Sequence, residues 1–351
     1  MRKLPFLVIA GSVSAVVAAG AGAWHVFGPG EAQSTGKSDK AELTTASIDT
    51  RWPKPVSKAP AEPAPKVQAV ATAPSAAPAQ PAAENRPAYA KPACNNPNAL
   101  GVARTVQIDT TGGPGLGMSQ YRDYDFLQPG EVVLTFDDGP WPNTTPAVLN
   151  ALAAQCVQAI FFPIGKHSTW HPAVLKQVIA AGHSVGTHTW SHQNLASKSP
   201  QEAIDEIERG ISAITLMAGQ PLAPFFRFPQ LRQTAELKAH LAQRNIATFS
   251  IDIDSEDFRV HNAQKLVTSM MDKLKKKGKG ILLMHDLHKW SAAAVPDLLA
   301  QLKAGGYKIV FIRPKGTLTT LPDYDAAIQA ELQPVKTSNA RPISSVIQTV
   351  D

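Results

Sequence analysis

The chain has 351 residues, and its 34 Lys and Arg against 28 Asp and Glu leave a formal net charge of +6. Length alone allows two domains, and a charge this small and dispersed argues against a nucleic-acid partner. The densest basic cluster, Lys275–Lys277 with Lys279, is more typical of a solvated helix end that stops at Gly278 than of a polyanion site.

The N-terminal segment, residues 1–30, begins with Arg2 and Lys3 and continues as an apolar run from Leu4 to Phe27. The run exceeds the ~18–20 apolar residues that cross a bilayer. It also has the order of a secretory signal, with small residues at 21–23. Either a membrane anchor or a signal peptide would direct the rest of the chain out of the cytoplasm. The length favours an uncleaved anchor, so we expect a periplasmic or extracellular protein tethered to the cytoplasmic membrane.

The next segment, residues 31–93, has the composition of a disordered linker. Residues 53–92 contain 10 Pro and 13 Ala, which leaves too little apolar surface for a core. Such a segment forms a semi-rigid spacer that extends by about 3.1 Å per residue. We therefore expect the linker to hold the following domain away from the membrane.

The two cysteines, Cys94 and Cys156, are the only ones in the chain. In an exported protein an even pair is more often a disulfide than a metal site. A bridge would tie the start of the folded domain to the end of its first helix.

Residues 94–325 alternate short apolar runs with helical patterns, which predicts an α/β fold with a parallel sheet, most simply a (β/α) barrel. The expected strands are 132–136, 159–164, 184–187, 225–227, 247–251, 280–284 and 308–312. The expected helices are 146–155, 172–181, 200–217, 234–244, 262–277 and 292–304. The tail, residues 326–351, has no clear pattern and is expected to be disordered.

Candidate ionisable side chains follow five of the seven strands of this prediction. Parallel barrels collect their functional residues at the carboxyl ends of the strands, so the set reads as one site. Adjacent acids Asp137 and Asp138 can take different roles if the chain turns at or after them, and Gly139-Pro140 supplies a turn. The later strands are followed by His188 and His192, Arg227, Asp254 and Asp257, and His285 and Asp286.

His188 and His192 have the i, i+4 spacing that lets two imidazoles meet one ion on a helical segment. One added carboxylate gives the ligand set of a catalytic zinc site with an open position for water. The second carboxylate of the Asp-Asp pair then stays free to act as a base.

The motifs, in this order, resemble those of the NodB-like polysaccharide deacetylases, carbohydrate esterase family four, over about residues 120–315. The matching segments are Thr135–Pro140, His188–His192, Arg227–Pro229, Asp254–Asp257 and Leu283–Asp286. The resemblance implies a distorted (β/α) barrel and a divalent metal, zinc or cobalt. It also implies hydrolysis of N-acetyl groups on an N-acetylhexosamine polymer such as peptidoglycan, or on chitooligosaccharides.

Carried over residue by residue, the resemblance makes Asp137 the base that activates water and His285 the acid that protonates the leaving amine. Arg227 would orient Asp137, and Asp254 or Asp257 would tune His285. The implied metal ligands are Asp138, His188 and His192, and the implied substrate and oxyanion residues are Gln230, Phe258, Leu283 and Trp190.

Two positions depart from the family's pattern. Gln230 stands where the family usually has Tyr, although its backbone N–H can still serve an oxyanion. Phe258 stands where the family usually has Trp. We expect an active enzyme of altered specificity, a monomer whose partners are a polysaccharide and the membrane. Trp190 and Trp290 could stack on sugar rings or simply pack. His167, His171, His183, His261 and His288 are expected at the surface or in packing roles, although His288 is close enough to His285 to line the site.

Three other readings stay open. The barrel could bind sugars without catalysis, or it could be an esterase that removes O-acetyl groups from an acetylated polysaccharide. A metal-dependent peptidase is the weakest reading, because the His-Glu-x-x-His signature is absent from the sequence.

Overall fold

The computed structural model describes Tyr89 and residues 94–333. The predicted anchor at residues 1–30 and almost all of the predicted linker at residues 31–93 lie outside this part, as do residues 334–351. Among the described helices, none has both the length and the hydropathy that a bilayer span requires.

The strands pair in parallel throughout the described residues, as the alternation of strands and helices predicted. One sheet holds β1 (Val102–Ile108), β10 (Lys308–Pro314), β3 (Glu131–Asp137), β4 (Ile160–Phe162), β5 (Ser184–Val185), β9 (Gly280–His285) and β8 (Ile253–Asp254). A second sheet holds β2 (Gly115–Leu116), β7 (Ala247–Phe249) and β6 (Phe225–Phe226). A single bridge between Thr187 and Phe226 joins the two. This arrangement is consistent with the distorted barrel that was predicted.

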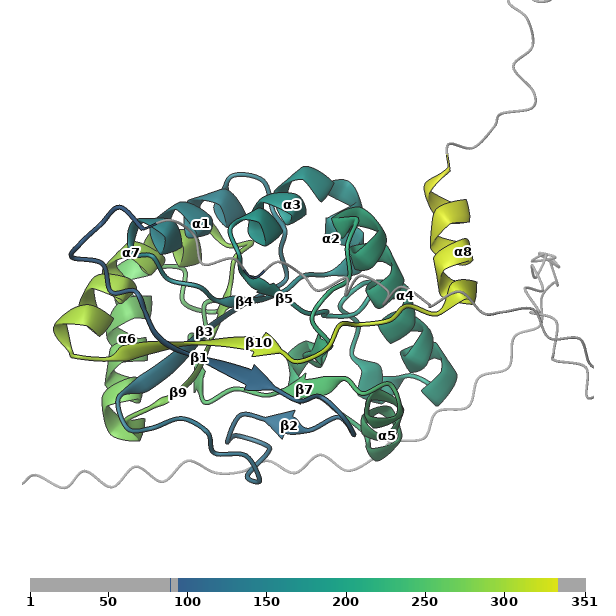
Figure 1. Cartoon of the computed structure of the whole chain (residues 1–351), viewed down its shortest axis with the longest axis horizontal. Helices are drawn as coiled ribbons and strands as arrows, with labels where there is room; N and C mark the ends of the chain where they lie inside the picture. The colour runs from purple at the N-terminus through teal and green to yellow at the C-terminus, as the bar shows by residue number, and fades with distance from the viewer. Residues whose placement is uncertain (1–88, 90–93, 334–351) are drawn as a thin grey trace, which may run out of the picture. The chain divides into compact units, whose positions relative to one another are not determined.

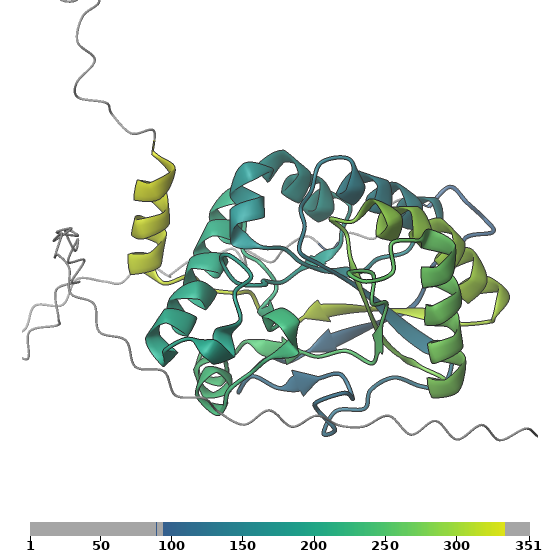
Figure 2. The ribbon, with the colours of Figure 1, turned by 180° about the vertical axis from the view of Figure 1, so that it is seen from behind.

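Helices lie along the top and both sides of the strands, whereas β1, β10 and β2 are uncovered at the front of Figure 1; Figure 2 shows the same arrangement from behind. Each helix contacts the next in the order α6, α7, α1, α3, α4, α5, and α2 contacts both α3 and α4. Their bounds are α1 Thr144–Ala154, α2 Gly165–Trp170, α3 Pro172–Ala180, α4 Pro200–Ala218, α5 Ala235–Gln243, α6 Ala263–Lys277, α7 Lys289–Ala304 and α8 Pro322–Leu332. Two short 3-10 helices, η1 (Leu195–Ser197) and η2 (Pro229–Leu231), complete the set.

The starts of α4 and α6 follow capping signals in the sequence. Ser199 and Glu202 form a complete capping box at α4, with Pro200 in the first turn. At α6, the Asn262 side chain accepts a hydrogen bond from the Lys265 N–H, and Gly278 ends the helix in a left-handed conformation.

Two apolar clusters divide the core between the faces of β3. Val132, Leu134 and Phe136 belong to the larger cluster with the helices, whereas Val133 joins a smaller cluster formed by strand residues. Because successive side chains of a strand point to opposite faces, Thr135 and Asp137 share the face of Val133. All seven residues of β3 are therefore buried, as both faces of a parallel strand are covered.

Besides α8 and the two 3-10 helices, the sequence patterns missed three strands and one α-helix. β1 alternates half-buried and exposed residues, so it has no continuous apolar run. β2 and β8 are two residues each, and α2 is six residues long with no side-chain cap. Each is too short or too polar to give a pattern.

The disorder predicted from residue 326 is wrong for residues 326–332, because α8 continues to Leu332. The helix has Pro322 in its first turn, and Ile328 is its one buried residue. Ile328 packs with Trp190 and Ala213, and Arg209 of α4 forms an ion pair with Glu331. Docking on α4 thus stabilises a helix whose own apolar face is almost absent.

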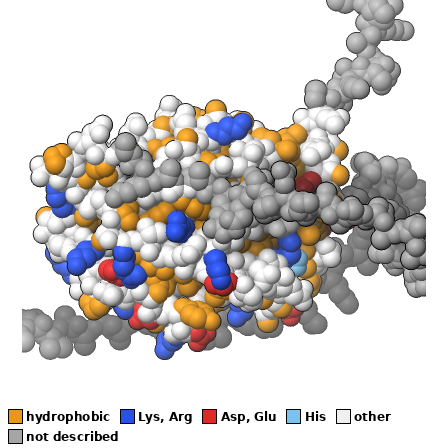
Figure 3. All heavy atoms as spheres, viewed as in Figure 1, with side chains coloured by type: hydrophobic (Ala, Val, Ile, Leu, Met, Phe, Trp, Pro, Cys, Tyr) orange, Lys and Arg blue, Asp and Glu red, His pale blue; other side chains and the backbone are white. Residues whose placement is uncertain are grey.

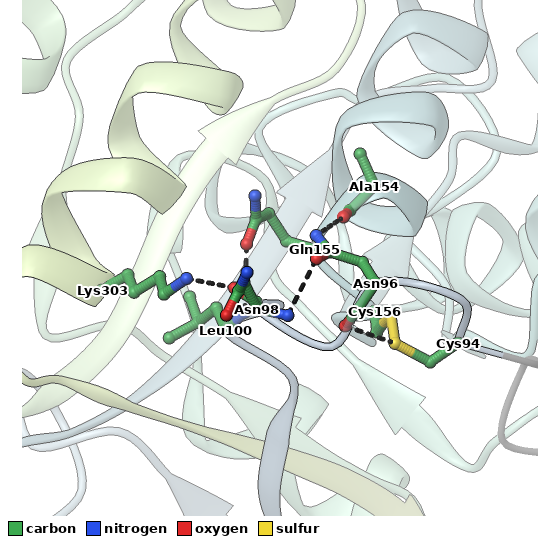
Figure 4. Close-up of a disulfide and its surroundings, with 8 residues drawn as sticks. All are labelled: Cys94, Asn96, Asn98, Leu100, Ala154, Gln155, Cys156 and Lys303. Carbon is green, nitrogen blue, oxygen red and sulfur yellow. Dashed lines mark hydrogen bonds between the residues drawn. A yellow bond between two sulfur atoms is a disulfide. The ribbon is translucent and has the colours of Figure 1, made fainter.

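The predicted disulfide is confirmed, with 5.5 Å between the Cα atoms of Cys94 and Cys156 (Figure 4). It links the start of the folded domain to the residues that follow α1. Hydrogen bonds extend the attachment: the Asn96 side chain donates to the Ala154 carbonyl at 2.9 Å, and Lys303 donates to the Asn98 carbonyl.

Basic side chains are scattered over the face shown in Figure 3. The Lys275–Lys277 cluster occupies the last turn of α6, as predicted. Within the cluster, Lys277 pairs with Asp252 at 2.9 Å. The neighbouring Lys279 pairs with Asp125 at 2.7 Å. These pairs favour the solvated helix end over a polyanion site.

Candidate active site

Asp137, the last residue of β3, is buried and held by Arg227 from the end of β6. The Arg227 Nη1 donates hydrogen bonds of 2.7 Å both to Asp137 Oδ1 and to Thr135 Oγ1. Arg227 is fully buried, with its guanidinium 4.4 Å from the centre of the Phe162 ring, and it also donates to the Ser250 carbonyl. Burial lowers the pKa of Arg227, and the charge of Asp137 opposes that shift. The pair orients the carboxylate inside the barrel.

The chain turns at Asp138 itself, one residue earlier than the Gly139-Pro140 turn predicted from the sequence. Asp138 has a φ of 74°, a left-handed conformation that Asp tolerates better than most residues. The turn brings Asp138 to the same site as Asp137. Gly139 follows without a side chain because a Cβ there would meet the carboxylate of Asp286.

His188 and His192 meet Asp138, although their segment is not helical as the i, i+4 argument supposed. Thr189 and His192 have φ values of 69° and 58°, and this irregular loop brings the two rings to a centroid distance of 4.9 Å. The His188 Nε2 lies 3.5 Å from Asp138 Oδ1, and the His192 Nε2 lies 3.4 Å from the same oxygen.

These three residues fit a divalent cation. One ligand atom from each lies within 4.8 Å of the others, and Asp138 Oδ1 is buried without a hydrogen-bond partner. His188 Nδ1 lies 2.7 Å from the Arg227 carbonyl, which favours the tautomer that leaves Nε2 free as a ligand. Burial lowers the pKa of His188 to about 4, so the imidazole is neutral near pH 7, as a ligand must be.

His285 lies beside Asp137, at the end of the neighbouring strand β9. The ring Nδ1 of His285 is 2.5 Å from Asp257 Oδ1, and the backbone N–H of His285 donates to Asp257 Oδ2 at 2.9 Å. Burial alone would lower the pKa of His285. The hydrogen bond to Asp257 and the charges of Asp138, Asp257 and Asp137 outweigh that effect and raise the pKa to about 10. His285 therefore carries a proton that it can donate.

Asp257, and not Asp254, is the acid that contacts His285. Asp254 Oδ1 accepts a hydrogen bond from the Glu256 N–H at 2.8 Å instead. Asp257 is further held by Ser291 and by Trp290, whose Nε1 donates to the Asp257 carbonyl at 2.6 Å. Of the two acids offered for this role, only Asp257 has the required geometry.

All four substrate residues predicted from the sequence are close neighbours of motif residues in the chain, and three of them remain candidates for substrate contact. Gln230 is exposed in η2 with a φ of 56°. Phe258 is 49% exposed, and its ring lies edge-on to His285 with 6.4 Å between the centroids. Leu283 is buried in β9, where it pairs with Thr135 and Asp254.

Trp190 is the exception, because it packs in the core and does not present a face for a sugar. It is 6% exposed and contacts Ala213 of α4 and Ile328 of α8. The Arg209 guanidinium covers its ring at 5.0 Å. Of the two roles left open for Trp190, packing is the one that its contacts support.

Two residues near the site had no predicted role. Asp286 is buried and accepts hydrogen bonds from the Gly139 N–H and from Thr145 Oγ1, which ties β9 to the Asp138 turn. Burial raises its pKa to about 7. His167, expected at the surface or in packing, has its Nδ1 2.6 Å from the Asp138 carbonyl. Only the position of Asp286 after a strand could have marked it in the sequence, and nothing marked His167.

Strained backbone concentrates in these loops. Positive φ values away from glycine occur at nine described residues, and seven of them lie in loops at the strand ends that carry the motifs: Asp138, Asn143, Thr189, His192, Gln230, Leu231 and Glu256. Such conformations persist where surrounding contacts hold them, and they cluster at functional sites.

A family model described as polysaccharide deacetylase matches residues 127–249. A chitooligosaccharide deacetylase of Bradyrhizobium is 33% identical over 155 residues, which are 44% of this chain and 70% of that protein. A peptidoglycan-N-acetylglucosamine deacetylase of Listeria monocytogenes is 32% identical over 186 residues, which are 52% of this chain but only 38% of that protein.

A solved structure supports the same relationship. The peptidoglycan deacetylase of Bdellovibrio bacteriovorus aligns with a TM-score of 0.56 and 30% identity, over 64% of this chain and 62% of that one. The motifs, the parallel α/β fold and these matches agree. The chain therefore belongs to the polysaccharide deacetylase family, the NodB-like carbohydrate esterase family four.

Proposed function

We propose that this protein is a metal-dependent hydrolase that removes N-acetyl groups from N-acetylhexosamine units of a cell-envelope polysaccharide such as peptidoglycan, or of chitooligosaccharides. One observation carries the proposal: a buried acid, Asp137, and an imidazole held by Asp257, His285, end adjacent strands beside an Asp-His-His cluster. Amide hydrolysis needs both a base for water and an acid for the leaving nitrogen.

Asp137 acts as the base in this proposal. Its Oδ2 lies 3.8 Å from His188 Nε2, so it borders the cluster without belonging to it. Arg227 occupies Oδ1, which leaves Oδ2 to take the proton of the water that attacks the acetyl carbonyl. His285 then gives its proton to the sugar nitrogen as the carbon–nitrogen bond breaks. Asp257 keeps the His285 ring oriented throughout.

Asp138, His188 and His192 would hold the divalent cation, zinc or cobalt. When bound, the cation supplies Lewis-acid polarisation of the acetyl carbonyl and lowers the pKa of water. The buried oxygen of Asp138 that lacks a hydrogen-bond partner supports this assignment. The backbone N–H of Gln230 is the proposed oxyanion donor, while Phe258 and Leu283 line the acetyl pocket.

We further propose that the enzyme works as a monomer outside the cytoplasm, tethered by residues 1–30 and spaced from the membrane by the Pro/Ala-rich linker. The support is the apolar run after Arg2 and Lys3, together with the composition of residues 31–93. Peptidoglycan lies in that compartment, which is consistent with the relatives that act on it.

The test is acetate release by the purified full-length chain from peptidoglycan, chitooligosaccharides and acetylated xylan. We expect acetate and free amines from the aminosugar polymers, loss of activity with a chelator, and recovery on adding zinc or cobalt. Release from acetylated xylan alone would replace the amide by an ester. No release from any substrate after metal is added would favour a lapsed, sugar-binding barrel.

A further inference from the structure

A cluster of four aromatic rings reaches Asp138 through one of its members, His167. It consists of Trp141, His167, Trp170 and His171, here called the Trp170 platform. Trp141 lies 5.1 Å from His167 and 5.3 Å from His171 between ring centroids, and His167 lies 5.2 Å from Trp170. None of these residues takes part in the proposed chemistry.

The platform exposes apolar surface without a partner among the described residues. Trp170 is 57% exposed, the highest value of any large hydrophobic side chain in the described part of the chain. An exposed aromatic side chain that belongs to a ring cluster, and not a lone surface residue, marks a surface used for binding.

The platform is also joined to the loops that carry the cation ligands. His167 Nδ1 contacts the Asp138 carbonyl at 2.6 Å. The first two N–H groups of α2, from Gly165 and Lys166, donate 2.9 Å hydrogen bonds to the Thr189 and Trp190 carbonyls. Trp170 therefore has a defined position relative to Asp138, His188 and His192.

We propose that the Trp170 platform is a glycan subsite, which stacks a pyranose ring of the same polymer strand whose N-acetyl group enters the active site. A pyranose presents a face of C–H groups that suits an indole ring, and Trp combines that contact area with little entropy loss. In this proposal the two aromatic surfaces contact different units of the strand: Phe258 lies beside His285, and the platform reaches Asp138 through His167. The inference rests on the proposed function, because the ligand assigned to the platform is the polysaccharide substrate that the proposed function names.

The experiment compares full-length Trp170→Ala and Tyr124→Ala with the wild type on N-acetylglucosamine oligomers of increasing length. Tyr124 is a matched control: it is 56% exposed, and it adjoins Asp125, which pairs with Lys279 at the start of β9, opposite the end that carries His285. Trp170→Phe, which keeps a ring, serves as the conservative variant.

We expect Trp170→Ala to raise KM for hexamers by roughly three- to tenfold, with a rise that grows with oligomer length and with little change in kcat. Trp170→Phe should recover most of the affinity, and Tyr124→Ala should match the wild type. An unchanged KM at every length, or an equal rise for the shortest and longest oligomers, would overturn the subsite.

The inference stays testable if the wild type releases no acetate, an outcome that would refute the proposed function alone. Co-sedimentation with insoluble chitin or peptidoglycan then measures binding directly. A bound fraction lower for Trp170→Ala than for Tyr124→Ala would support the subsite, and equal fractions would refute it. A concentration-dependent dimer that disappears in Trp170→Ala, with glycan binding unchanged, would assign the platform to a second copy of the chain.

Discussion

Asp137 and His285 occupy partner positions in the register of the parallel strands β3 and β9. Partners in a parallel pair point to the same face of the sheet. The proposed base and acid are thus delivered side by side, separated by about the 4.8 Å spacing of neighbouring strands. A shift of one residue between β3 and β9 would send one of the two groups to the opposite face.

The division of labour between the adjacent acids can be tested with Asp137→Asn and Asp138→Asn. Both variants should lose turnover by at least about a hundredfold, because each removes a carboxylate needed for reaction. Only Asp138→Asn should lose metal, since Asp138 Oδ1 lies 3.5 Å and 3.4 Å from the two histidine nitrogens. Metal content after dialysis and zinc titration calorimetry measure the difference. Loss of metal in Asp137→Asn would mean that the two roles are exchanged.

The pH dependence should report the contact between Asp257 and His285. As an acid, His285 must be protonated, so activity is lost as pH rises through its pKa, which the Asp257 contact helps raise to about 10. Asp257→Asn removes that contact and should shift the alkaline limb of kcat/KM to lower pH, with kcat reduced about a hundredfold.

Asp254→Asn is the control, because Asp254 bonds the Glu256 N–H and not His285. The measurement is a full pH–rate profile for each variant. An alkaline limb that moves in Asp254→Asn and stays in place in Asp257→Asn would contradict the assignment.

Stability in mild acid should depend on His183, which lies outside the active site. Its Nδ1 accepts a hydrogen bond from the Ala159 N–H at 3.1 Å, and burial lowers its pKa to about 3. The unfolded chain binds a proton near pH 6.5, where the folded protein does not. The free energy of unfolding should therefore fall as pH drops from 6.5 towards 3, by up to about 1.4 kcal/mol per pH unit.

Urea unfolding of the wild type and His183→Gln at pH 7, 6, 5 and 4 measures this slope. His183→Gln should be less stable at pH 7 but should lose less stability in acid, because it has no group to protonate. His188 contributes the same slope to both proteins. Parallel stability curves would show that His183 is not responsible.

Gly210 of α4 should prove essential to the loop that carries His188 and His192. A Cβ there would lie 2.5 Å from the carbonyl carbon of Thr189. Alanine favours a helix by about 1 kcal/mol over glycine, but the overlap must displace the loop or the helix. We expect Gly210→Ala to lower the melting temperature and to weaken zinc binding by about tenfold or more.

Gly316→Ala is the matched substitution, because nothing lies within 4 Å of a Cβ at Gly316 and its φ is not positive. It should change neither property. Zinc affinity in Gly210→Ala equal to that of the wild type would show that the loop tolerates the displacement.

The sequence by itself determined the α/β class, the order of the strands from β3 onward apart from β8, and the candidate residues at their ends. These features are local. A buried parallel strand needs an apolar run, a helix start needs a cap, and a polar residue after a strand needs no distant partner to be noticed. The Cys94–Cys156 bridge was also accessible, because only one pairing of two cysteines exists.

Only the tertiary structure decided which of these residues meet. It placed the turn at Asp138, joined His188 to His192 through an irregular loop, chose Asp257 over Asp254, and buried Trp190 between α4 and α8. It also ordered α8, whose stability comes from docking on α4, and brought His167 next to Asp138. Each outcome depends on strand register, left-handed backbone or long-range packing, and these are set by contacts between segments far apart in the chain.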